Sequence, residues 1–127
     1  MNKLKQVLLV RKHLQMNPGK MGAQISHASR SAIFSQMQDS NRGKFLRLTR
    51  YERQWYDGPH TTIVKWVKNE NQLLKAYEKA KEMGFPCALI KDMGLTVFDE
   101  PTLTTVGIGP ADFNQIQKIT KRFQLVS

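Results

Sequence analysis

The sequence has little cysteine and no long hydrophobic run. Its 127 residues include one cysteine, Cys87, so no disulfide can form within the chain. We expect Cys87, which lies in an apolar segment, to be a buried structural thiol. Apolar runs such as Val7–Val10 are much shorter than the ~20 residues that a membrane-spanning helix needs. These absences exclude a disulfide-stabilised miniprotein, argue against a membrane protein and indicate a reducing, cytoplasmic setting.

The sequence also lacks the common motifs for metals and nucleotide cofactors. It contains no G-x-x-x-x-G-K-S/T phosphate loop, no G-x-G-x-x-G fingerprint and no G-x-S-x-G nucleophile elbow. Its histidines, His13, His27 and His60, show no spacing typical of metal ligands. We therefore expect an enzyme built on this chain to use neither a metal nor a nucleotide cofactor.

Acidic residues are half as numerous as basic ones. Twenty Lys and Arg against ten Asp and Glu give a net charge of +10. Such a charge favours polyanionic partners, meaning nucleic acid or, failing that, an anionic membrane surface. With 40% hydrophobic residues the composition is otherwise that of a globular protein, and we expect one domain covering residues 1–127.

The hydrophobic pattern predicts strands that alternate with helices. Val7–Val10 is typical of a central strand that is buried on both faces. Asn17 and Pro18 are typical of a helix start, because Asn caps free N–H groups and Pro fits the first helical turn. The expected strands cover residues 7–10, 62–67, 87–90 and 104–108. The expected helices cover about residues 17–37, 45–56, 69–84 and a last segment after Pro110.

This order, β-α-α-β-α-β-β-α, favours an α/β fold in which a four-stranded mixed sheet has helices on both faces. Ligands of such sheets collect at the carboxyl ends of the strands. Functional side chains are therefore expected near those ends.

The first predicted helix carries a line of polar residues. Lys20, Gln24, His27 and Ser31 share one helix face by their spacing. Lys20 and the exposed amides of the helix end could bind an anion. Alternatively, Lys20 is solvated and the other residues are satisfied structurally.

Asp92 follows the third predicted strand, in the segment Asp92-Met93-Gly94. A carboxylate at a strand end is well placed to act as a general base or to orient a water molecule. Asp-x-Gly is also a common turn in which Asp caps the backbone. Thr96 and Thr104 could donate hydrogen bonds to a substrate oxygen, or they could simply favour strands.

The second predicted helix is basic and carries aromatic residues. Lys44, Arg47 and Arg50 would form one stripe along it, suited to phosphate contacts, with the aromatic side chains free to stack on bases. Alternatively, the basic face is only solvated and the aromatic side chains enter the core. The basic residues are Arg42, Lys44, Arg47, Arg50 and Arg53.

Two motifs occur together in this chain, G-K-x-x-A-Q-x-x-H-A over residues 19–28 and D-x-G-x-T over residues 92–96. With the segments 5–11, 74–84 and 104–110, they make the chain resemble the archaeal/eukaryotic-type (class II) peptidyl-tRNA hydrolases. The resemblance covers about residues 5–126 and is carried by the two motifs in combination, since neither alone is specific.

The resemblance implies a four-stranded mixed sheet and a homodimer. It also implies hydrolysis of the ester that joins a peptide to the 3′ end of tRNA, with peptidyl-tRNA bound through its acceptor end. Residues proposed for catalysis in the family correspond to Lys20, Asp92, Thr96 and Thr104. Gln24 and His27 match supporting positions in the family's helix motif.

Two mechanisms are open for the water molecule. Asp92 could orient or deprotonate it, or His27 could act as the base, although we expect His27 to be buried against the sheet. A Lys20–Asp92 pair would make Asp92 a weaker base, which favours the orienting role.

The alternative function is a non-catalytic RNA-binding or protein-interaction module on the same fold. Two departures from the family pattern favour it. Asp99-Glu100-Pro101 places carboxylates in the loop before the last strand, and Thr61-Thr62 replaces a basic residue.

Overall fold

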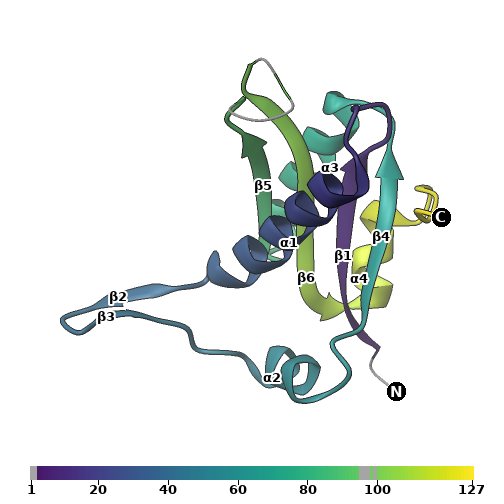
Figure 1. The fold of residues 1–127 in the computed structure, drawn as a ribbon. Helices are drawn as coiled ribbons and strands as arrows, with labels where there is room; N and C mark the ends of the chain where they lie inside the picture. The colour runs from purple at the N-terminus through teal and green to yellow at the C-terminus, as the bar shows by residue number, and fades with distance from the viewer. Residues whose placement is uncertain (1–2, 95–97, 99) are drawn as a thin grey trace.

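The structure is a computed structural model that describes residues 3–94, 98 and 100–127. Its main sheet contains four strands in the order β4-β1-β6-β5 (Figure 1). These strands are β1 (Leu4–Arg11), β4 (Thr62–Val67), β5 (Cys87–Asp92) and β6 (Thr102–Asp112). The helices are α1 (Pro18–Phe34), α2 (Arg50–Asp57), α3 (Glu70–Glu82) and α4 (Phe113–Thr120). The predicted mixed α/β fold and its order of helices and main strands are confirmed.

The sheet is mixed because β4 pairs parallel to β1, whereas β6 runs antiparallel to both β1 and β5. The carboxyl ends of β1, β4 and β5 therefore meet the amino end of β6 at one edge, at the top of Figure 1. We call this the catalytic edge, because the predicted catalytic residues Lys20, Asp92 and Thr104 lie there.

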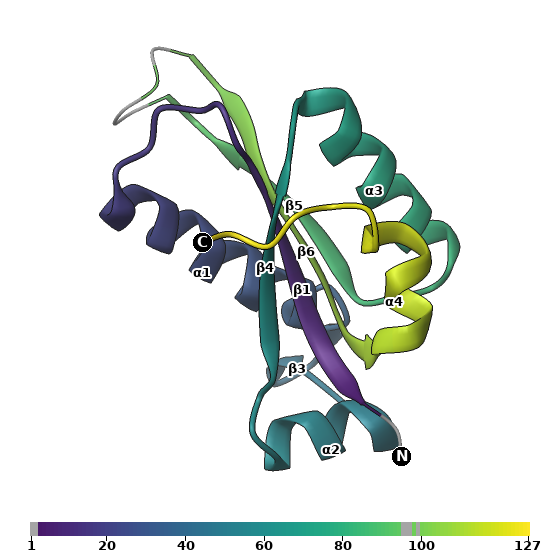
Figure 2. The same ribbon diagram turned by 90° about the vertical axis from the view of Figure 1, so that its right-hand side faces the viewer.

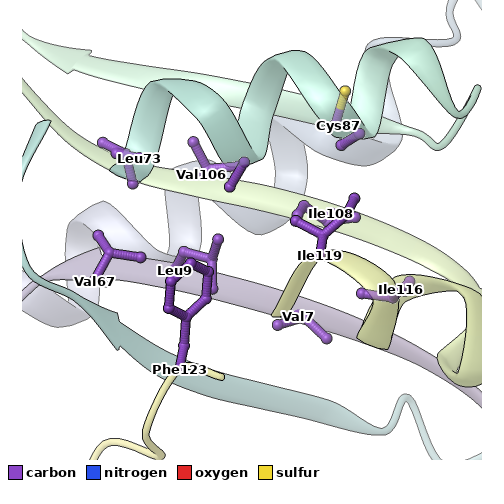
Figure 3. Close-up of a cluster of buried hydrophobic side chains, with 12 residues drawn as sticks. Val7, Leu9, Val67, Leu73, Cys87, Val106, Ile108, Ile116, Ile119 and Phe123 are labelled. Atoms are coloured by element: carbon purple, nitrogen blue, oxygen red, sulfur yellow. The ribbon is translucent and has the colours of Figure 1, made fainter. Parts of the chain in front are cut away.

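Helices cover both faces of the sheet, with α1 on one side and α3 and α4 on the other (Figure 2). Val7 and Leu9 of β1 point into a cluster with Val106, Leu73 and Ile116 on the α3–α4 side (Figure 3). The intervening Leu8 and Val10 are equally buried. The continuous apolar run therefore forms a central strand buried on both faces, as predicted. Cys87 is also buried, as expected.

Two local features place α1. The side chain of Asn17 accepts a hydrogen bond of 2.8 Å from the backbone N–H of Lys20, which fixes the helix start. Gly107 of β6 lets α1 approach closely, since a Cβ there would lie 2.4 Å from the carbonyl oxygen of Ala28. Lys20 is thereby held in the first turn of a helix that lies directly against β6.

The segment between α1 and β4 differs from the prediction. Residues 38–45 form a small antiparallel hairpin, β2 (Gln38–Ser40) and β3 (Gly43–Phe45), which projects from the body of the protein (Figure 1). Helix α2 begins at Arg50, because Thr49 and Glu52 form a capping box that ends the preceding extended segment. Lys44 lies in β3, so the predicted helical stripe of Lys44, Arg47 and Arg50 is wrong.

Within the described residues, no helix is long and apolar enough to cross a membrane.

Candidate active site

Four side chains that are far apart in the sequence meet at the catalytic edge. Lys20 and Gln24 come from the first two turns of α1, Asp92 ends β5, and Thr104 lies near the start of β6. Hydrogen bonds link them in one chain. The structure thus brings together three of the four predicted catalytic residues and one of the two supporting residues.

The centre of this chain is an ion pair between Lys20 and Asp92. The ammonium group of Lys20 donates to Oδ2 of Asp92, and the two side chains are only 12% and 10% exposed. The backbone N–H of Gly94 donates to Oδ1 at 2.9 Å. Asp92 therefore caps its own turn and also binds Lys20, so the structural and the functional interpretations of this residue are both present.

Gly94 is required by this turn. Its φ of +80° lies in the left-handed region, and a Cβ would lie 2.8 Å from the backbone carbonyl carbon of Glu100. Glycine therefore allows the loop to close while its N–H points at Asp92.

The charge state of Asp92 follows from these contacts. The hydrogen bond from Lys20, and then that from the Gly94 backbone, lower the pKa of the Asp92 carboxyl, although burial acts in the opposite direction. Coulombic interactions with Lys20 and then His27 lower this pKa further. Asp92 is therefore a carboxylate at neutral pH and a weak proton acceptor.

Gln24 connects the ion pair to β6. Its Nε2 lies 3.4 Å from Oδ2 of Asp92, and its Oε1 accepts a hydrogen bond of 2.6 Å from the hydroxyl of Thr104. The Thr104 hydroxyl also lies 2.9 Å from that of Thr105. Gln24 and both threonines are buried, so this polar chain is fixed within the protein.

A shift in strand register aims Thr104 at α1. The pairing of β5 with β6 moves from Ile90 opposite Thr105 to Lys91 opposite Leu103, which leaves Thr104 as an extra residue on β6. Such a bulge re-aims side chains, and here neighbouring Thr104 and Thr105 approach each other through their hydroxyls. The bulge lets Thr104 reach Gln24.

His27 does not lie where we expected. It is exposed rather than buried against the sheet, because it falls on the outer side of α1, next to buried Ala28. Among the described residues its ring forms no hydrogen bond with Asp92, although a coulombic interaction with it lowers the pKa of that carboxyl. The expected burial of His27 is therefore wrong.

Thr96 and Asp99 lie outside the described residues. Glu100, the second carboxylate in the loop that differs from the family pattern, is exposed. Thr61-Thr62 is the second segment that differs from the family pattern. There the carbonyl of Thr61 accepts a hydrogen bond of 2.9 Å from the indole N–H of Trp55.

All five basic residues of the predicted RNA-binding segment are exposed. They lie on the β2–β3 hairpin, the segment after it and α2, and we call them the hairpin–α2 basic surface. Two of them form exposed ion pairs, Lys44 with Asp39 and Arg53 with Asp57. Trp55 is buried and so enters the core. Tyr51 and Tyr56 are exposed, as stacking on bases would require.

Sequence reasoning missed Arg11, at the carboxyl end of β1. Its guanidinium donates a hydrogen bond of 3.0 Å to the carbonyl of Leu103, the residue before Thr104. Its buried Nε has no hydrogen-bond partner among the described residues. A charged residue directly after a buried apolar strand was the available signal.

No group of three His, Cys, Asp or Glu in the described part of the chain could hold a metal ion.

Residues 4–126 match the family model described as Peptidyl-tRNA hydrolase PTH2. This chain belongs to the PTH2 family. A protein named peptidyl-tRNA hydrolase from Staphylothermus marinus is 38% identical over 122 residues, covering 96% of this chain and 94% of that protein. Proteins of the same name from Sulfolobus acidocaldarius and Thermococcus onnurineus are 33% and 30% identical, covering 97% and 99% of this chain and 100% of each relative.

The PTH2 match confirms the family resemblance found from the two motifs. It covers every residue of the hydrogen-bonded chain between Lys20 and Thr105.

Proposed function

We propose that residues 1–127 form one catalytic domain that hydrolyses the ester between a peptide, or an N-blocked amino acid, and the 3′ end of tRNA. Membership of the PTH2 family supports this reaction. The observation that carries the proposed site is the Lys20–Asp92 pair, held from both sides by Gln24 and Gly94 at the catalytic edge.

Asp92 orients the attacking water in this proposal. A carboxylate with a lowered pKa accepts a proton poorly, but it accepts a hydrogen bond well. An aminoacyl ester is already activated, so a positioned water and a stabilised oxyanion suffice. Lys20 supplies positive charge to that oxyanion, a contribution of about 3 kcal/mol in comparable sites.

The remaining residues hold the substrate or the site. Thr96 binds the ester or the terminal ribose through its hydroxyl. Thr104, which the sequence also placed on the substrate, holds the site instead, because its hydroxyl is buried and donates to Gln24. Gln24 positions Asp92 and Thr104, because it bonds to both. His27 has a supporting role, through its coulombic interaction with Asp92.

The protein recognises its substrate through the RNA backbone and not through the base sequence. The hairpin–α2 basic surface, Arg42, Lys44, Arg47, Arg50 and Arg53, contacts phosphates of the tRNA acceptor stem. We further propose that the protein forms a homodimer, which analytical sedimentation tests. We also propose that it acts in the cytoplasm, which cell fractionation tests. Among the residues that the structure describes, no observation favours the non-catalytic alternative.

The test is release of the acyl group from an N-acetylated aminoacyl-tRNA by the purified protein. We expect release by the wild type and not by Lys20→Ala, with tRNA binding retained in the variant. Binding of tRNA without release by the wild type would contradict the proposed reaction. Release by Lys20→Ala at the wild-type rate would contradict the proposed site.

A further inference from the structure

A second basic surface lies on the side of the sheet opposite α1, in two adjoining hollows. The first, of about 370 Å³, is lined by Lys12, Lys68 and Arg122, with His13 among the other residues. The second, of about 260 Å³, is lined by Lys75, Lys79, Lys118 and Arg122. We call these six lysines and arginines the α3–α4 basic surface.

The two hollows form one surface because they share Arg122 and Phe123. Phe123 is buried in the core cluster, and the guanidinium of Arg122 lies 5.0 Å from the centroid of its ring. Arg122 is thus held at the junction by a cation–π contact.

The charged groups of this surface lack ion-pair partners in the described structure. In the part of the chain that the structure describes, none of the six residues forms an ion pair, and no Asp or Glu lines either hollow. Clustered like charges repel one another, so the cluster disfavours the folded state unless a polyanion binds.

Helix dipoles explain only part of the cluster. Lys79 and Lys118 lie in the last turns of α3 and α4, where a cation is favourable. Lys75 lies in the middle of α3, and Lys12 and Lys68 follow strands. The helix dipoles therefore do not explain these three positions.

The position of the surface relates it to the site. Lys12 directly follows β1, and Lys68 directly follows β4, so both lie at the catalytic edge with Asp92. The second hollow is lined by residues of α3 and α4 and by the residues that follow α4. These two helices lie side by side on this face of the sheet (Figure 2). In contrast, α2 lies at the opposite end of the sheet (Figure 1).

We propose that the α3–α4 basic surface binds the phosphates of the tRNA acceptor arm that lie nearest the 3′ end and leads that end to Lys20 and Asp92, whereas the hairpin–α2 basic surface contacts phosphates farther from it. The inference rests on the proposed function, since it takes tRNA as the substrate. A duplex of A-form RNA is recognised mainly through its phosphates, its 2′-hydroxyls and its shape, which suits a surface of lysines without sequence readout.

The test compares two double variants with the same change in charge. Lys75→Gln/Lys79→Gln removes two charges from the surface, and Lys81→Gln/Lys121→Gln removes two from residues that line neither hollow. Fluorescence anisotropy with deacylated tRNA measures affinity against salt. We expect the surface variant to bind about tenfold more weakly, with a salt slope reduced by about two, and the control to stay within about twofold.

Turnover separates this inference from the proposed function. With full-length substrate, KM should rise in the surface variant while kcat is unchanged. With an N-blocked aminoacyl ester of a short CCA oligonucleotide, both doubles should match the wild type. Equal tRNA affinity of the two doubles, in an active enzyme, would overturn the inference alone. An inactive wild type would overturn the proposed function, and the binding comparison would still decide the RNA surface.

Discussion

Two ion pairs of this protein contain the same groups in different settings. Lys20 and Asp92 lie at the catalytic edge with side chains 12% and 10% exposed. Lys44 and Asp39 lie on the β2–β3 hairpin with side chains 65% and 84% exposed, 2.8 Å apart. Exposed pairs contribute about 0–1 kcal/mol to stability, because water competes for both groups. The buried pair has additional partners that fix its geometry, which an exposed pair lacks.

The comparison teaches that a Lys–Asp contact is not by itself a site. Gln24 and Gly94 both contact the buried carboxylate. Among the described residues, Asp39 has no side-chain partner other than Lys44. Orientation of a water molecule needs a fixed carboxylate, so only the buried pair suits catalysis.

The largest expected difference is between two matched substitutions. Asp92→Asn should lower the single-turnover rate about 10³-fold, because the amide presents an N–H or one oxygen where water needs a carboxylate. Asp39→Asn should leave the rate within about twofold, since its pair is exposed. Retention of more than about a tenth of the rate by Asp92→Asn would contradict the role of Asp92.

A second pair of substitutions tests how α1 is placed. Gly107→Ala should lower the free energy of unfolding by about 1–3 kcal/mol, since the new Cβ meets the backbone of Ala28. Gly22 lies on the exposed side of α1, and a Cβ there would have no neighbour within 4 Å. Gly22→Ala should therefore raise the free energy of unfolding by about 0.5–1 kcal/mol. Urea unfolding measures both, and effects of the same sign would refute the packing argument.

Gln24 should matter for rate rather than affinity. Gln24→Leu removes the contacts to Asp92 and Thr104, and we expect kcat to fall about tenfold with KM unchanged. The matched control is Gln36→Leu, which removes a hydrogen bond to Glu52 far from the site and should alter stability but not kcat. A fall in kcat of equal size in both variants would show a general structural effect.

The smallest expected effect is a change in titration. The pKa of Asp92 should lie below its ordinary value of 3.8 and rise in Lys20→Met, because the first cause of the shift is lost. The ionised carboxylate stabilises the fold fully above that ordinary value, and this contribution is lost as pH falls through the lowered folded pKa. Carbon NMR of the carboxyl measures it, with Lys44→Met as the control expected to change nothing.

The main strands and α1 followed from local sequence. An apolar run such as Val7–Val10 is buried on both faces wherever it lies in a covered sheet, and Asn17 with Pro18 marks a helix start. The hairpin was missed because residues 38–45 are mostly polar and show no alternation. The capping residues Thr49 and Glu52 were the available signal for the true start of α2.

The site was only partly predictable. Spacing placed Lys20 and Gln24 on one helix face, but their meeting with Asp92 came from the family resemblance. The bulge at Thr104 depends on how β5 pairs with β6, which no local pattern encodes. The exposure of His27 depends on the rotation of α1 against the sheet, which helical spacing alone did not determine.

The central claim is that Lys20 and Asp92 act as one unit in ester hydrolysis. A double-mutant cycle of Lys20→Ala and Asp92→Asn, measured as single-turnover release from N-acetylated aminoacyl-tRNA, tests it most directly. We predict strong non-additivity, with the double variant about as slow as the slower single variant. Independent effects that multiply in the double variant would contradict the claim.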